Sequence, residues 1–162
     1  MNGSKFYRIL MGMVILILAA CQPISTPPTP TPQAKSCVDF SGYPDNTTFG
    51  NPFGLNSYQF TGLGAEPFVN VSGGVVGLQF IDAGLEIDLP GPASAVTLDA
   101  ASFTSRPLTL SALNSSGVAV ANATVPGDNT VHNVALSGNN IVKVTITGGG
   151  NEGVLVEVCS AP

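Results

Sequence analysis

The sequence predicts an all-β fold: an antiparallel sandwich or barrel of about eight to ten strands. Charged residues make up only 9% of the chain, and it contains 19 glycines and no tryptophan. This composition is typical of strands joined by tight turns rather than of amphipathic helices. From residue 75 onward, short alternating stretches of apolar and polar residues are separated by Gly, Pro, Asn and Ser clusters. Such alternation indicates antiparallel strands with one buried face.

Eight strands are predicted in this part of the chain. They cover Val76–Ile81, Leu85–Leu89, Ala95–Asp99, Leu108–Leu113, Gly117–Val125, Val131–Leu136, Ile141–Thr147 and Val154–Cys159. Turns at this spacing favour a sandwich or barrel, and residues 37–162 have the length of one domain.

The first strand begins at Cys37 and the last ends at Cys159, which predicts how the two pair. If Val38 and Val158 face the core, both cysteines face the other way. If Cys37 lies opposite Cys159 in an antiparallel pair, Asp39 lies opposite Glu157. Partners in one antiparallel register have residue numbers with a constant sum, and both pairs add up to 196. We expect a disulfide here, which stabilises the fold by about 4 kcal/mol in the chain-entropy model.

Two carboxylates placed opposite each other repel by up to ~1 kcal/mol when they are exposed. A cation bound between the two carboxylates would offset their repulsion, and Ca²⁺ prefers such hard oxygen ligands. Asp39 and Glu157 are therefore candidate calcium ligands. The alternative is two solvated carboxylates on an exposed face.

The amino-terminal residues 1–20 have the pattern of a signal peptide. Lys5 and Arg8 form a basic region, and an uncharged run follows from Ile9 to Ala20. This run is shorter than the ~20 residues that span a bilayer as a helix, so a signal peptide is favoured over a membrane anchor.

The run ends in Leu18-Ala19-Ala20-Cys21, which resembles the lipobox of bacterial lipoproteins. In that family the cysteine receives diacylglycerol, the chain is cut before it, and fatty acids such as palmitate are usually added to the new amino terminus. Several acyl chains give stable membrane anchoring. The resemblance implies lipid on Cys21, and it leaves Cys37 and Cys159 as an even pair in an oxidising compartment. The residue after the cysteine is Gln22, whereas an Asp there would resemble a signal for retention in the inner membrane. The sequence therefore favours the outer membrane or the cell surface.

Residues 21–36 join the lipid to the domain and are rich in proline and threonine. Recurring proline favours an extended polyproline conformation of ~3.1 Å per residue. We expect this segment to be a tether that holds the domain away from the membrane.

The charge balance excludes nucleic acid as a partner. Residues 37–162 hold two cations, Arg106 and Lys143, against all ten carboxylates, a net charge of -8. Nucleic acids and anionic lipid headgroups require clustered cations. The balance is compatible with the binding of cations, of neutral glycans or of nothing at all. An envelope protein is a further candidate partner.

The opening Val38-Asp39-Phe40, with residues 45–50 and Tyr58-Gln59-Phe60, resembles the start of jelly-roll modules related to galactose-binding and carbohydrate-binding domains. The resemblance implies neighbouring first and last strands, structural Ca²⁺ near the termini and sugar-binding loops. Aromatic residues concentrate between residues 43 and 68, and we expect Tyr43 and Tyr58 to be exposed and to contact a ligand. We expect the phenylalanines there to pack over the ends of the sandwich, and the alternative is that the aromatic loops stack on sugar rings.

Catalytic motifs are absent from the sequence. His132 is the only histidine, no Gly-x-Ser-x-Gly elbow is present, and one histidine with two bonded cysteines does not make a zinc site. We therefore expect a non-enzymatic module that binds a glycan or another cell-surface ligand. The alternatives are a structural envelope lipoprotein acting through protein contacts and a hydrolase using Glu86 and Asp88 as an acid/base pair.

Overall fold

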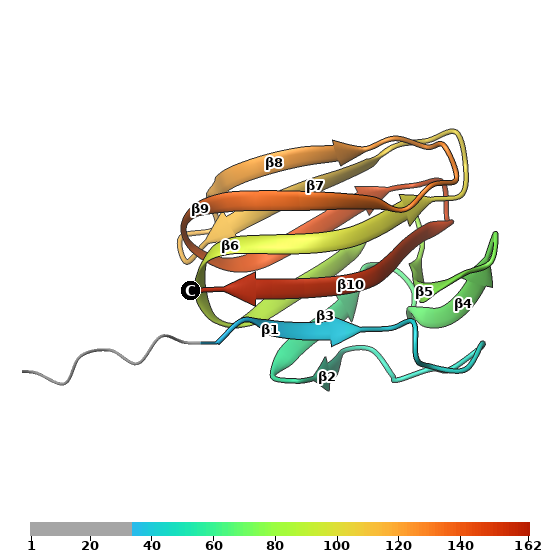
Figure 1. The fold of residues 1–162 in the computed structure, drawn as a ribbon, viewed down its shortest axis with the longest axis horizontal. Coiled ribbons are helices and arrows are strands. Elements are labelled where there is room, and N and C mark those ends of the chain that lie inside the picture. Colours follow the sequence, from blue (N-terminus) through green and yellow to red (C-terminus); the bar gives the residue numbers. More distant parts are fainter. Residues whose placement is uncertain (1–33) are drawn as a thin grey trace, which may run out of the picture. The chain divides into compact units, whose positions relative to one another are not determined.

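The computed structural model describes residues 34–162; the predicted signal peptide, Cys21 and most of the tether lie outside the described residues. Within residues 34–162 the chain forms ten strands and no helix, and the all-β class is confirmed (Figure 1). Residues 34–162 therefore include no candidate for a membrane-spanning helix. The strands are β1 (Ser36–Asp39), β2 (Phe53–Leu55), β3 (Tyr58–Gly62), β4 (Phe68–Ser72), β5 (Val75–Phe80), β6 (Leu85–Ser102), β7 (Leu108–Asn114), β8 (Ala119–Val125), β9 (His132–Gly148) and β10 (Gly153–Ala161).

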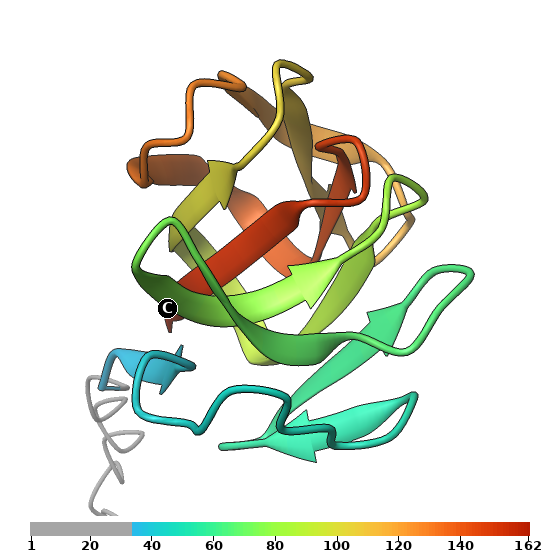
Figure 2. The same ribbon diagram turned by 90° about the vertical axis from the view of Figure 1, so that its right-hand side faces the viewer.

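The strands pair antiparallel in the order β4-β5-β10-β6-β9-β7-β8, with β1 on β10 and β3 joining β2 to β6. Strands β6 and β9 belong to two layers. Their halves around Leu98 and Val134 continue from β10, whereas their halves around Ile87 and Val144 pair with β3 and β7. The sheet therefore folds over on itself, and Figure 2 shows the strands wrapped around a common interior. This arrangement is consistent with a β-sandwich, and the jelly-roll order stays a prediction.

Four of the predicted strands are in fact two long, bent ones. Leu85–Leu89 and Ala95–Asp99 are both parts of β6, and Val131–Leu136 and Ile141–Thr147 are both parts of β9. The register between the two strands shifts on either side of Ala93, which marks bulges at the bend. Because proline cannot donate to a ladder, a bulge is where a strand tolerates it. The Pro-Gly-Pro sequence at residues 90–92 therefore bends the strand instead of ending it.

The core is formed by the inward-facing residues of both layers. Because side chains alternate along a strand, Leu85 and Ile87 on β6 face inward together with Val144 and Ile146 on β9, and all four are fully buried. The opposite layer contributes Val38, Val96, Leu98, Leu136 and Val158. All of these side chains lie within residues 34–162, so this part of the chain contains the core that it needs to fold on its own.

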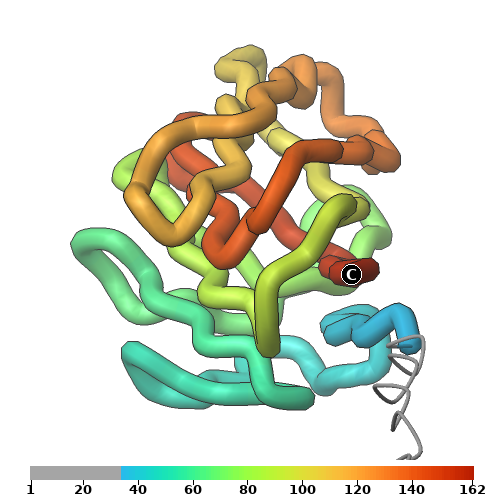
Figure 3. The backbone as a smooth tube through the Cα atoms, turned by 90° about the vertical axis from the view of Figure 1, so that its left-hand side faces the viewer, coloured from blue at the N-terminus to red at the C-terminus, as the bar shows by residue number. Residues whose placement is uncertain are grey.

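The pairing of the first and last strands is confirmed, and so is its register. Cys37 lies opposite Cys159 and Asp39 opposite Glu157. The two cysteines form a disulfide with a Cα–Cα distance of 4.0 Å. Figure 3 shows the carboxyl terminus beside the blue segment that contains β1. The disulfide thus fixes the short edge strand β1 to β10, close to the start of the described residues.

Replacing both cysteines, as Cys37→Ser with Cys159→Ser, should lower the free energy of unfolding by about 5 kcal/mol in the chain-entropy model. The bond joins residues 122 positions apart, and such a long closed loop restricts the unfolded chain strongly. Urea denaturation of residues 34–162, followed by circular dichroism, measures the effect. Equal urea concentrations at the unfolding midpoint for the double variant and for the oxidised protein would show that the bond does not stabilise the fold.

Candidate functional site

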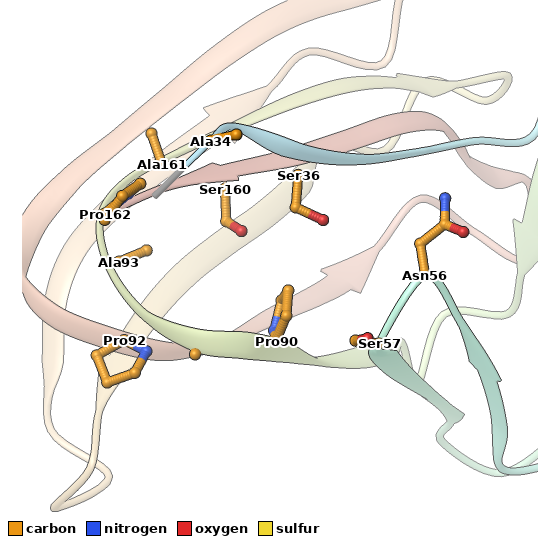
Figure 4. Close-up of a pocket in the computed structure, with 11 residues that line it drawn as sticks. Ala34, Ser36, Asn56, Ser57, Pro90, Pro92, Ala93, Ser160, Ala161 and Pro162 are labelled. Carbon is orange, nitrogen blue, oxygen red and sulfur yellow. The ribbon is translucent and has the colours of Figure 1, made fainter. Parts of the chain in front are cut away.

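A pocket of about 150 Å³ lies at the end of the domain where the described chain begins and ends. Its lining comes from the start of β1, the β2–β3 turn, the bend of β6 and the end of β10 (Figure 4). The residues are Ala34, Ser36, Asn56, Ser57, Pro90, Gly91, Pro92, Ala93, Ser160, Ala161 and Pro162. None of these side chains is charged, and the polar ones carry hydroxyl or amide groups.

The hydroxyl of Tyr58 connects two of the strands that line the pocket. It donates a hydrogen bond to the Ser36 carbonyl at 2.6 Å and lies 2.8 Å from Ser160 Oγ. Ser36 and Ser160 are opposite each other in the β1–β10 ladder, one position from the disulfide. The expectation that Tyr58 is exposed is wrong: its side chain is 1% exposed, because the ring completes the core while its hydroxyl satisfies strand groups. Tyr58 therefore positions other groups and offers no exposed ring to a ligand.

The β2–β3 turn forms one side of the pocket. Asn56 and Ser57 have φ values of 48° and 68°, the left-handed conformation that a two-residue hairpin turn of type I′ requires. Asn56 also donates from Nδ2 to the Cys37 carbonyl at 2.9 Å, which ties the turn to β1. The side of the pocket is thereby fixed by backbone geometry and one side-chain hydrogen bond.

The aromatic residues of the segment from 40 to 60 form a packed cluster. Phe49 stacks on Phe53 with ring centroids 4.8 Å apart, and Phe53 stacks on Phe60 at 5.1 Å. Tyr43 is half-buried and meets Phe49 edge to face at 5.1 Å. Phe53 and Phe60 are therefore buried in the core and Phe49 packs against it, so these phenylalanines pack inward as expected, and Tyr43 stays partly exposed.

The acidic pair predicted as a calcium site belongs to a longer row. Asp39 and Glu157 are register partners, and Glu157 is also the partner of Asp99 on β6. Asp39 Oδ1 accepts the Ser41 amide at 2.8 Å, and Asp99 Oδ1 accepts the Asn133 side-chain amide at 2.6 Å. Among the described residues, the group of three metal-type ligands within 4.8 Å of one another is Cys37, Glu157 and Cys159, without Asp39. Since its two sulfurs are bonded to each other, this group is not evidence for a metal.

Both cations of the domain form ion pairs. Lys143 Nζ lies 2.7 Å from Glu86 Oε2 and 3.4 Å from Asp88 Oδ1, and Arg106 Nη1 lies 3.0 Å from Asp82 Oδ2. The hydrogen bond to Glu86 is the main reason why the pKa of Lys143 is raised above its ordinary value. Both carboxylates of the alternative acid/base pair are therefore engaged in holding one lysine.

His132 opens β9 and faces a single partner. Its Nε2 lies 3.0 Å from both carboxylate oxygens of Asp128, and this hydrogen bond is the main reason why the pKa of Asp128 is lowered. No hydroxyl group hydrogen-bonds to His132 among the described residues. The arrangement is that of a partly exposed hydrogen-bonded pair beside a loop.

Sequence reasoning did not find the pocket. Its residues come from four segments that are far apart in the sequence. Most of them are alanine, serine, glycine or proline, which do not mark a binding site in a sequence. The detectable signals were local: Asn56-Ser57 as a turn, and Pro90-Gly91-Pro92 as an interruption of a strand.

No family model matches the chain, and no curated protein matches it. Among solved structures, the chain is similar to an arabinose-bound GH51 α-L-arabinofuranosidase, with 16% sequence identity and a TM-score of 0.46. The match covers 80% of this chain but 26% of the enzyme's, and at this TM-score it carries no argument about function.

Glu86→Gln should lower the pKa of Lys143, because it removes the charged acceptor at 2.7 Å. Asp88→Asn is the matched control and should lower it less, because Asp88 lies farther away. Because the pKa of Lys143 is raised in the folded state, its ion pair contributes fully to stability at pH values below the pKa of the unfolded state. This contribution is lost as the pH rises through the pKa of the folded state. NMR titration of the Lys143 side chain measures the shift, and equal effects of the two variants would contradict the assignment.

Proposed function

We propose that this chain is a lipid-anchored, non-enzymatic binding module on the extracytoplasmic side of a bacterial membrane, and that it binds a glycan or another cell-surface ligand. One observation supports the anchoring above all others. The disulfide uses Cys37 and Cys159, so no second cysteine of this chain is left to pair with Cys21. A lipobox cysteine that has no disulfide partner is then free to accept lipid, and a disulfide suits an exported domain.

The uncharged pocket supports binding of a neutral polar ligand. It lies where β1 begins, next to the tether, and its hydroxyl and amide groups can form hydrogen bonds without a counter-charge. Pockets that bind small molecules combine apolar walls with a few polar groups that fix orientation. The hydroxyls and proline rings of this pocket have that character.

Cys21→Ser should release the protein from the membrane while the domain stays folded. Fractionation of the producing bacteria, together with metabolic labelling by a fatty acid, measures retention and lipidation. A circular dichroism spectrum like that of the unchanged protein is the control for folding. Retention and labelling that are both unaffected by Cys21→Ser would contradict lipid anchoring.

Residues 22–162, without the lipid, should be retained by at least one neutral polysaccharide or glycan in an affinity panel. If the panel retains nothing, the glycan proposal fails. A pull-down from envelope extracts then tests the alternative, a structural lipoprotein that acts through protein contacts.

Calcium at Asp39 and Glu157 is the further proposal for this domain. If it binds there, Ca²⁺ should raise the melting temperature relative to EDTA, because a cation offsets the repulsion of opposed carboxylates. Asp39→Asn should abolish the difference, whereas Asp45→Asn, outside the ladder, should preserve it. Equal melting temperatures of the unchanged protein in Ca²⁺ and in EDTA would rule this site out.

A further inference from the structure

The hydrogen bonds of Tyr58 determine what Ser160 offers to the pocket. A phenol has one proton, and the Ser36 carbonyl at 2.6 Å can only accept it. The Ser160 hydroxyl, 2.8 Å from the same phenol oxygen, must therefore donate its own proton to Tyr58. Since its proton is used, Ser160 Oγ can act toward a molecule in the pocket only as an acceptor.

This acceptor is fixed in place. Ser160 is 7% exposed and lies on β10, one residue from the disulfide, so its backbone cannot move independently of β1. Figure 4 shows the Ser160 and Ser36 side chains pointing to the same side, toward the strand that carries Pro90. A preorganised acceptor that faces an open pocket selects a ligand that brings a hydroxyl or amide proton.

The other polar groups of the pocket are uncharged as well. Asn56 uses an Nδ2 proton on the Cys37 carbonyl, which leaves its Oδ1 as a second acceptor. The Ser57 hydroxyl has no hydrogen-bond partner among residues 34–162, so it can both donate and accept. An anionic ligand would lose hydration here without gaining an opposite charge, so the pocket disfavours it.

The remaining walls are apolar and small. Pro90, Pro92 and Ala93 come from the bend of β6, and Figure 4 shows Pro90 pointing toward Ser36 and Ser160 across the pocket. Pockets for drug-sized ligands span roughly 300–1,000 Å³, so one of about 150 Å³ suits a single small ring. Apolar walls on one side and hydroxyls on the other match a ring with a C–H face and several hydroxyl groups.

We propose that this pocket binds one neutral, hydroxyl-bearing ring: a terminal, uncharged sugar residue of a glycan. In this arrangement a sugar hydroxyl donates to Ser160 Oγ, other hydroxyls bond to Ser57 and Asn56, and the C–H face packs against Pro90. This assignment rests on the proposed glycan-binding function and names the site for it.

The experiment is an NMR titration of ¹⁵N-labelled residues 22–162 with methyl glycosides of glucose and galactose. The backbone amides of Ser36, Ser57, Gly91 and Ser160 should shift together, with a dissociation constant on the order of millimolar for so small a ligand. Glucuronic acid, which is an anion, should bind several-fold more weakly than the neutral glycosides. Binding of glucuronic acid that equals that of the neutral glycosides would overturn the ligand class.

Two variants assign the contact to Ser160. Ser160→Ala removes the acceptor and should weaken binding about fivefold, the effect of one neutral hydrogen bond. Ser111→Ala, on β7 and away from the pocket, is the matched control and should bind normally. The free energy of unfolding of each variant shows whether it is folded. If Ser160→Ala does not fold, Ser36→Leu, which fills part of the pocket and keeps the carbonyl that Tyr58 uses, replaces it.

The outcomes separate this inference from the proposed function. If a glycan is retained in the affinity panel but the pocket amides do not shift, the function stands and the pocket is the wrong site. If neither a retained glycan nor shifts at the pocket are found, both proposals fail. Shifts at the pocket that Ser160→Ala weakens and Ser111→Ala leaves unchanged support the assignment.

Discussion

The pairing of β1 with β10, fixed by the Cys37–Cys159 disulfide, is the interaction on which the rest of the structure depends. Strand β1 has four residues and lies at an edge, so its hydrogen bonds alone hold it weakly. The covalent bond keeps Val38 in the core and keeps Ser36 opposite Ser160. The accepting carbonyl for Tyr58, and with it one side of the pocket, therefore depends on this register.

The second constraint is the bend shared by β6 and β9. Both strands continue from one layer into the other, so each contributes to the core twice. The extra residues at the bend include Pro90 and Pro92, which also line the pocket. The feature that folds the sheet over its core is thus the same feature that supplies the apolar wall of the candidate site.

The sequence determined the register of the terminal strands because two rules acted together. Alternation along a strand fixes which residues share a face, and one cysteine pair fixes which residues are opposite. Strands β2, β3 and β4 were not predicted, because they are short and interrupted by glycine and asparagine. The bends of β6 and β9 were predicted as turns between separate strands. The local residue types do not show that the hydrogen-bonded ladder continues beyond each bend.

The candidate site was the least predictable part. Tyr58 was expected to be exposed, but its ring packs in the core and its hydroxyl bonds to Ser36 and Ser160, which are distant from it in the sequence. The pocket exists only once β1, β6, β10 and the β2–β3 turn meet. Asp39 and Glu157 were correctly placed opposite each other, because that followed from the register alone.

The allocation of the three cysteines is the central claim, and peptide mapping tests it most directly. Protein isolated from bacterial membranes without reductant is digested and analysed by mass spectrometry. We predict one disulfide-linked peptide pair that contains Cys37 and Cys159, and an amino-terminal peptide in which Cys21 carries diacylglycerol. A disulfide from Cys21 to either of the other two cysteines, or an unmodified Cys21 in membrane-bound protein, would contradict the account.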